Sequence, residues 1–146
     1  MKLSTNSRYG LRALVDLAAN YRGAPVALCD IARRQKISES YLEQAFGTLR
    51  KAGFVRSSKG AQGGYAPAGD PAQIPAGAVL RALEGDLKIV ENSPVYRGGD
   101  AIKRSIRENL WDAVDQRLSA LVDSITLEDL AREYMRMRGN AHEYEQ

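Results

Sequence analysis

The chain of 146 residues contains a single cysteine and carries a net charge of +3, so it fits one domain, or a small domain with an extended helical element, without an intramolecular disulfide. Residues 1–10 lack the apolar core of a signal peptide and no stretch is long and apolar enough to span a membrane, so we expect a cytoplasmic protein with no membrane partner. Residues 1–60 contain eleven Lys and Arg and four Asp and Glu, a net charge of +7, whereas residues 61–146 contain ten and fourteen, a net charge of −4. This asymmetry predicts that the first half of the chain binds a partner rich in phosphate. The alternative is that the basic residues of the first half are only solvated.

The first predicted helix runs from about Ser7 to Tyr21, with Asn6 or Ser7 near its N-terminal cap. Apolar residues at helical spacing form its expected buried stripe: Leu11, Leu14, Val15, Ala18 and Tyr21. If the domain is a winged helix, the start of this helix lies near the DNA backbone, and the candidate phosphate contacts are then Ser4, Arg8 and Tyr9. The alternative for each of them is a place on an ordinary capped surface helix.

A short helix, a turn and a second helix follow between residues 28 and 52. Leu28, Ile31 and Ala32 form one apolar stripe, Ile37 lies in the turn, and the second helix begins at about Ser38 or Glu39. Its inward face is apolar and consists of Tyr41, Leu42, Ala45, Phe46 and Leu49. Its outward face is polar and consists of Ser40, Glu43, Gln44, Gly47 and Lys51.

The outward face of this second helix, residues 39–52, carries side chains that can read base edges. Gln44 can pair bidentately with adenine, and Glu43 can accept a hydrogen bond from the exocyclic amine of cytosine. The candidate base-reading residues are Ser40, Glu43 and Gln44. The positive charge expected to meet the DNA backbone around them comes from Arg50, Lys51 and Arg56.

A glycine-rich hairpin over about residues 54–67 follows and completes the pattern of a winged helix-turn-helix. Residues 54–56 predict a short strand, and residues 59–65, KGAQGGY, predict a tight loop that returns as a second strand. The candidate wing contacts are Lys59, Gln62, Gly63, Gly64 and Tyr65. A buried helix pair beside an ordinary hairpin is the alternative, but the wing and the local charge together favour double-stranded DNA as a partner.

The DNA-binding domain is expected to cover residues 1–85, because a short apolar helix with Ala78, Val79, Leu80 and Leu83 stops at Gly85. Residues 86–100 show little periodicity and predict an exposed connecting loop. Residues 139–146 are expected to form a flexible tail. The fold class is therefore mainly α, a winged helix-turn-helix domain followed by a long C-terminal helix.

That long helix is expected to begin near Asp100 or Ala101 and to carry one narrow apolar seam. Its residues recur every three or four positions: Ile102, Ile106, Leu110, Val114, Leu118, Leu121 and Ile125. Such a seam is best buried against its twin in a second subunit, with Trp111 beside it as an interface anchor. The alternative is packing within the chain on residues 127–137, whose stripe is Leu127, Leu130, Ala131 and Tyr134. We favour a homodimer with dimerisation helices over residues 101–138, because a palindromic operator calls for a two-fold symmetric reader.

With these motifs in place, the chain resembles the Rrf-type (Rrf2) bacterial winged-helix regulators. The matching pieces are LSTNSRYGLRAL at 3–14, ISESYLEQAFGTLRKAGFV at 37–55, KGAQGGYAPA at 59–68, LWDAVDQRL at 110–118 and ITLEDLA at 125–131. The resemblance implies a dimeric transcription factor in which Ser40, Glu43 and Gln44 read the major groove. It also implies that the wing around Lys59 to Tyr65 enters the minor groove.

Two departures from the family's pattern matter, one for the geometry of the turn, as strain or a slightly different turn, and one for what the protein senses. Lys36 stands where many members have glycine in the turn between the two helices. Cluster-binding members carry three closely spaced cysteines in the loop corresponding to residues 86–100, and this chain has none there, so no iron–sulfur cluster or other cofactor is expected. The chain is accordingly nearer to the family's cysteine-metabolism repressors than to its iron–sulfur regulators.

The single cysteine and the single histidine predict no metal site. Cys29 is expected to be a small, partly buried residue, with a redox role as the alternative. His142 lies near the C-terminus and is expected to be solvated.

The predicted function is that of a dimeric, sequence-specific transcriptional repressor that controls genes of sulfur or cysteine metabolism. The alternative is a protein-interaction or ligand-sensing module whose DNA binding depends on a partner enzyme or a small-molecule effector. The sequence shows no paired His and Cys, no Ser-His-Asp set and no phosphate-binding loop between a strand and a helix, so we expect no enzymatic activity.

Overall fold

The structure, a computed structural model, describes residues 2–90 and 100–145, with side chains described as far as Gly139. The part of the expected loop between 91 and 99, and the side chain of His142, lie outside the described residues. The elements are α1 (Thr5–Asn20), α2 (Leu28–Gln35), α3 (Glu39–Lys51), β1 (Val55–Ser58), β2 (Gly64–Pro67), a 3-10 turn η1 (Pro71–Gln73), α4 (Ala76–Glu84), α5 (Ala101–Ile106), a π-helical turn η3 (Arg107–Trp111), α6 (Asp112–Ser124) and α7 (Leu127–Glu145).

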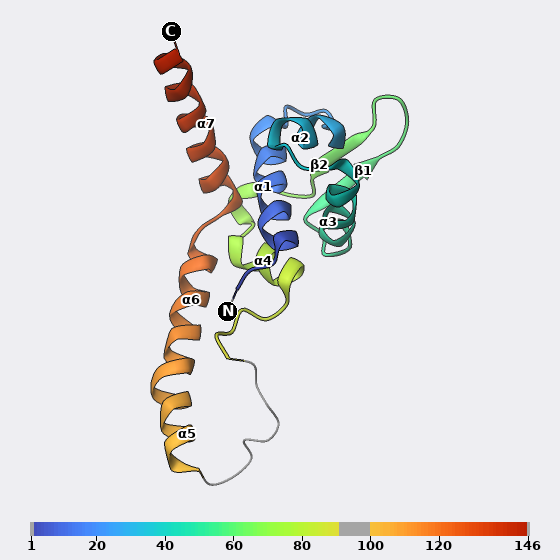
Figure 1. Ribbon diagram of the computed structural model, residues 1–146. Helices are drawn as coiled ribbons and strands as arrows, with labels where there is room; N and C mark the ends of the chain where they lie inside the picture. The colour runs from blue at the N-terminus through green and yellow to red at the C-terminus, as the bar shows by residue number, and fades with distance from the viewer. Residues whose placement is uncertain (1, 91–99, 146) are drawn as a thin grey trace.

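Two parts of the molecule are visible in Figure 1. Helices α1 to α4 and the β1–β2 hairpin form a body, and α5, η3, α6 and α7 form an elongated arm along one side of it. In this view the hairpin projects from the opposite side of the body. The predicted mainly helical winged helix-turn-helix is confirmed.

Helix α1 is at the centre of the body, where it packs against α2, α3, α4 and α7. It begins at Thr5 because Ser4 is its cap: the Ser4 Oγ accepts a hydrogen bond from the backbone N–H of Ser7. The prediction of a cap at Asn6 or Ser7 was therefore wrong by two or three residues. The predicted stripe was also too narrow, because neighbours surround the helix: Ala13, Leu14 and Leu17 are fully buried, whereas Leu11, Val15 and Ala18 are only partly covered.

The turn between α2 and α3 lies where the sequence predicts it. Lys36 ends α2 in the left-handed conformation, with φ 56° and ψ 46°. Ile37 is buried, and the Ser38 Oγ accepts from the backbone N–H of Tyr41 as the N-cap of α3. The predicted start of the second helix is confirmed, and its last residue is Lys51.

The wing is an antiparallel hairpin in which Val55 pairs with Pro67 and Ser58 with Gly64. The structure adds a partner that the sequence did not reveal, because β2 also pairs with the segment before α2. Val26 and Tyr65 exchange two backbone hydrogen bonds of 2.8 Å. The wing is therefore anchored to the helix-turn-helix at its base.

The junction between α6 and α7 belongs to the body. The backbone N–H of Ala76 donates to the carbonyl of Ile125 at 2.7 Å, and that of Leu127 donates to the carbonyl of Ile74 at 2.8 Å. Leu127 and Ala131 are buried, and Leu127 is part of the same core as Leu14 and Phe46. Part of the segment 101–138, which we predict to form the dimerisation helices, therefore also contributes to the core of its own chain. Helix α7 also continues to Glu145, where a flexible tail was predicted.

Candidate nucleic-acid interface

The outward face of α3 is polar and open to solvent. Ser40, Glu43 and Gln44 are exposed. The other side of the helix is buried in the core through Leu42, Ala45, Phe46 and Leu49. Because residues on a helix turn by about 100° each, this burial leaves the three polar side chains directed away from the body. The structure thus brings together the three predicted base-reading residues on one exposed surface.

Two aromatic contacts support α3 from behind. The rings of Phe46 and Tyr65 meet edge to face with centroids 4.9 Å apart, and those of Tyr41 and Tyr9 do so at 5.6 Å. Each pair adds about 0.5–1.5 kcal/mol to the burial of its rings. Both α1 and the wing therefore hold the recognition helix, and the Tyr9 and Tyr65 rings are engaged in this support.

Two of the predicted wing contacts serve the fold. Tyr65 is half-buried against Phe46 and joined to Val26 through its backbone. A Cβ atom at Gly64 would lie 2.3 Å from the Val26 carbonyl oxygen, so only glycine permits this strand pairing. Both residues are thus engaged in the fold, and their contact with DNA stays a prediction.

The exposed residues of the wing lie in the loop between β1 and β2. Lys59 and Gln62 are exposed, and the backbone N–H of Gly63 closes the turn on the Gly60 carbonyl at 3.0 Å. Further positive charge comes from Arg50 and Lys51, both exposed in the last turn of α3, and from Arg56 on β1. The Arg56 Nη2 donates to the Pro67 carbonyl at 3.4 Å, which holds its stem along the hairpin. Basic side chains thus flank the polar face of α3, where backbone phosphates would lie.

The start of α1 differs from the prediction at Ser4. Its backbone N–H and its Oγ both donate to the Glu84 Oε2, at 3.0 and 2.6 Å, and the Ser7 Oγ donates to the same atom. These bonds, from Ser4 first and Ser7 second, lower the pKa of Glu84 below its ordinary value. Ser4 is exposed, but its hydrogen-bonding groups are engaged with Glu84 and Ser7, and its contact with a phosphate stays a prediction. Arg8 remains exposed, its Nη2 donating to the Thr5 Oγ1 at 3.2 Å.

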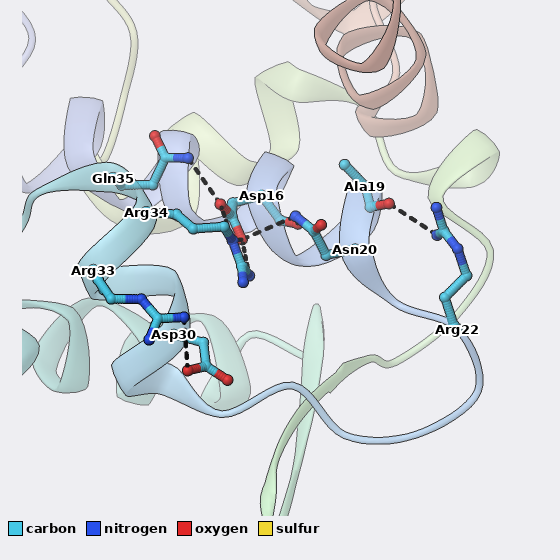
Figure 2. A network of polar contacts seen from close by, with 8 residues as sticks. All are labelled: Asp16, Ala19, Asn20, Arg22, Asp30, Arg33, Arg34 and Gln35. Atoms are coloured by element: carbon cyan, nitrogen blue, oxygen red, sulfur yellow. Dashed lines mark hydrogen bonds and ion pairs between the residues drawn. The ribbon is translucent and has the colours of Figure 1, made fainter. Parts of the chain in front are cut away.

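A buried polar network joins α1 to α2 beside the turn (Figure 2), and the sequence analysis missed it. Asp16 is 0% exposed and accepts hydrogen bonds from Arg34, Gln35 and Asn20. The available signal was its place next to Leu14 and Leu17, because a charged residue at core spacing needs buried partners. The contact of Glu84 with Ser4 could not be predicted in this way, because the two residues are about eighty positions apart in the sequence.

The apolar seam on the arm is largely uncovered by other side chains of the same chain. Large side chains along it are exposed, among them Ile102 at 68%, Leu121 at 60%, Leu110 at 49% and Ile106 at 42%. Trp111, Val114 and Leu118 are partly covered. Helix α7, the predicted alternative cover, packs instead against α1 and η1.

The π-helical turn η3 aligns the two halves of this seam. In an uninterrupted α-helix, Ile106 and Val114 would point about 80° apart, because each residue turns by about 100°. The extra residue that a π turn accommodates reduces this angle to about 20°. The hydrogen bond from the Asp112 N–H to the Arg107 carbonyl marks that turn. The arm therefore presents Ile102, Ile106 and the seam residues of α6 on one side.

The remaining predicted features concern redox and metal chemistry. Cys29 is exposed on α2, which corrects the expectation of a partly buried residue. Within the described ranges, no three His, Cys, Asp or Glu side chains gather as ligands for a metal ion. The same part of the chain contains no helix of sufficient length and apolar character to cross a membrane.

A polar α3 face, a basic wing anchored beside it and a buried helix-turn-helix define a DNA-binding transcriptional regulator of the winged helix-turn-helix class. Comparison with known families agrees: the family model Rrf2, described as an iron-dependent transcriptional regulator, matches residues 3–133. The chain belongs to the Rrf2 family.

Individual relatives cover most of the chain. It is 41% identical to the transcriptional regulator CymR of Bacillus subtilis over an alignment of 131 residues, and this alignment covers 90% of each protein. It is 39% identical over 132 residues to the regulator IscR of Serratia proteamaculans, over 89% of this chain and 79% of that one. Among solved structures, it is similar to CymR (YrzC), the global cysteine regulator of B. subtilis, with a TM-score of 0.78, 39% identity, and coverage of 91% of this chain and 98% of that one.

The iron in the family's description can be tested against this chain's own donors. Iron–sulfur clusters are held chiefly by several thiolates. The sequence supplies one cysteine, and it lies exposed on α2. The residues of this chain do not fit a thiolate-held cluster within one subunit.

Proposed function

We propose that the protein is a homodimeric repressor that binds a palindromic operator, with α3 in the major groove and the wing in the minor groove. The carrying observation is the α3 face, where Ser40, Glu43 and Gln44 are exposed on a helix that the core holds from behind. Carboxylate, amide and hydroxyl groups on such a helix suit the donors and acceptors of base edges. Lys59, Arg50 and Lys51 supply the contacts to phosphates, which position the protein without reading sequence.

The proposed dimer rests on the seam of the arm. A contiguous row of exposed large apolar side chains marks an interaction surface, since monomers rarely leave one uncovered. A second copy is the occupant that we propose, because isologous pairing of the arms gives the two-fold symmetry that a palindrome requires. The occupied operator would then exclude RNA polymerase.

We further propose that the regulated genes belong to cysteine or sulfur metabolism and that the protein acts in the cytoplasm. The support is the similarity to CymR, named as a global cysteine regulator in B. subtilis. The missing loop cysteines separate this chain from a thiolate-cluster sensor, so the effector would be a metabolite or a metabolic enzyme.

The test begins with a duplex selected by the purified protein from a random pool. Glu43→Ala should relax preference at one base position and weaken binding to that duplex by about 1–3 kcal/mol. Lys59→Ala should weaken selected and random duplexes alike and lower the slope of log Kd against log salt by about one. Equal losses on both duplexes for Glu43→Ala would contradict the base-reading assignment.

The same selection decides between the proposal and its alternative. If the purified protein selects one operator by itself with nanomolar affinity, no partner is needed for DNA binding. Selection that succeeds only after a metabolic enzyme or small molecule is added would favour the partner-dependent module.

A further inference from the structure

The carboxylate of Asp16 is the most completely buried charged group in the described residues, with 0% of the residue exposed. Figure 2 shows that two of its partners, Arg34 and Gln35, come from the last turn of α2. The Arg34 Nη2 donates to Oδ1 at 2.7 Å, the Arg34 Nε lies 3.1 Å from Oδ2, and the Gln35 Nε2 donates to Oδ2 at 2.8 Å. On α1 itself, the Asn20 Nδ2 lies 3.3 Å from Oδ1.

This arrangement fixes orientation as well as distance. A guanidinium that contacts both oxygens of a carboxylate lies in one plane with it, so rotation of either group weakens both bonds. The contact with Asp16 is also the main reason that the pKa of Arg34 is raised. The paired groups thus hold one face of α1 and the end of α2 in a single relative geometry.

A second tether acts on the same turn. The Arg12 Nη2 donates to the backbone carbonyl of Gln35, while the side chain of Gln35 donates to Asp16. Arg12 and Asp16 lie one turn apart on α1, so the last residue of α2 is held at both its backbone and its side chain. Only residues 36–38 separate it from Glu39, the first residue of α3. The direction in which α3 leaves the turn therefore depends on this attachment.

Stability alone is a poor explanation for the pair. Apolar residues of similar volume in place of a buried ion pair often stabilise a protein equally well or better. The surrounding core already supplies apolar contacts through Leu14, Leu17 and Ile31. A directional contact has its clearest use where a helix must be placed accurately against base edges.

We propose that Asp16 is a positioning residue for sequence recognition: through Arg34 and Gln35 it sets the start and direction of α3. The inference rests on the proposed function in that α3 reads the operator. Its consequence is that operator discrimination depends on the Asp16 contact even in protein that remains folded.

The test measures a specificity ratio, the Kd for a random duplex divided by the Kd for the duplex selected by the wild-type protein, at one salt concentration. Asp16→Asn in the full chain should lower this ratio by about tenfold, the size of one lost base contact. A loss of folded protein alone would raise both Kd values by the same factor and leave the ratio unchanged. Circular dichroism at the binding temperature reports the folded fraction.

Matched controls lie on the same helix pair in Figure 2. Asp30→Asn removes an exposed carboxylate that pairs with Arg33 at 3.3 Å, and it should leave the ratio unchanged. If Asp16→Asn fails to fold, Arg34→Lys takes its place, because lysine keeps the charge but lacks the bidentate geometry. Its control is Arg33→Lys, which makes the same change at the exposed pair.

The outcomes separate this inference from the function on which it rests. A lowered ratio for Asp16→Asn or Arg34→Lys, with unchanged controls, supports the positioning role. A lower melting temperature with an unchanged ratio overturns it, as does an equal fall in the controls. If Glu43→Ala lowers the ratio and the Asp16 and Arg34 variants do not, only this inference fails. If the wild-type protein selects no sequence, the proposed function and this inference fail together.

Discussion

The Oγ of Ser4 lies 2.6 Å from the Oε2 of Glu84, so the residue that caps α1 is held by the last residue of α4. Three residues before the end of α4, Arg81 pairs with Asp123 of α6 at 2.7 Å. Helix α4 therefore connects the end of α1 that carries Arg8 to the arm that carries the apolar seam.

The Glu84 contact should make stability depend on pH. Hydrogen bonds from Ser4 and then Ser7 lower the pKa of Glu84, so the folded state binds the proton less readily than the unfolded state. The contact thus stabilises the fold above the ordinary pKa of glutamate, about 4.3, and the stabilisation is lost as the pH falls through the lowered value. Glu84→Gln should lower the melting temperature at pH 7, and the difference from wild type should shrink at acidic pH.

A double-mutant cycle assigns that effect to the contact. Ser4→Ala should cost less stability in the Glu84→Gln background than in the wild type, because only the cap of α1 then remains to be lost, the bond to Glu84 having already gone. Additive effects of the two substitutions, or a difference from wild type that does not shrink as the pH falls below the ordinary pKa of glutamate, would contradict the assignment.

Disruption of the seam should separate the subunits. Leu110→Asp places a charge among exposed apolar side chains that we expect to meet their twins, and it should convert the dimer to monomers in sedimentation experiments. Operator affinity should fall by about a hundredfold or more, because one half-site remains bound without the other. Gln116→Asp changes an exposed residue on the other side of α6 and should leave the dimer intact. Dimers that persist in Leu110→Asp would place the interface elsewhere.

Two glycine substitutions should have opposite effects on stability. Gly64→Ala puts a Cβ 2.3 Å from the Val26 carbonyl oxygen and should cost about 1–3 kcal/mol by separating the wing from the segment before α2. Gly47→Ala lies within α3, where no neighbouring side chain would meet its Cβ within 4 Å, and should add about 0.5–1 kcal/mol through helix propensity. Urea denaturation measures both, and a neutral Gly64→Ala would show that the bridge contributes little.

Lys36→Gly should stabilise the turn between α2 and α3. The left-handed conformation costs a residue with a Cβ about 1–2 kcal/mol, which glycine avoids. Glycine also makes the unfolded chain more flexible, and this lowers the gain in stability by about 0.5–1 kcal/mol. A net gain of about 0.5–1 kcal/mol is expected at φ 56°. Lys36→Ala keeps the Cβ while removing the charge, so it should show no such gain. Equal stabilisation by both variants would trace the effect to charge.

Local signals made the recognition helix and the wing predictable. Ser38 is a good N-cap, the apolar and polar residues of α3 alternate with helical period, and glycines mark the hairpin loop. Each of these preferences acts within a few residues, so the chain expresses them wherever it folds. The exposed seam followed from the same periodicity. Its alignment by η3 did not, because a π turn has no reliable sequence signature.

The roles of Ser4, Tyr65 and Asp16 depend on contacts across the chain. The sequence predicts a phosphate contact for Ser4 and a DNA contact for Tyr65, whereas in the structure Ser4 bonds Glu84 and Tyr65 packs on Phe46 and pairs with Val26. Asp16 interrupts the apolar pattern of its helix, and its partners Arg34 and Gln35 lie on α2. Composition and spacing do not reveal which distant residue will satisfy a polar atom.

Local sequence patterns are enough to predict a winged helix-turn-helix with a polar outer face on α3, because capping, periodicity and turn chemistry are local properties. The folded chain shows which polar side chains are held by distant residues, as Ser4 is by Glu84 and Arg34 by Asp16, and which stay exposed, as Glu43 and Gln44 do. Free and occupied side chains have the same chemistry, and their difference lies in the partners that folding brings within hydrogen-bonding distance.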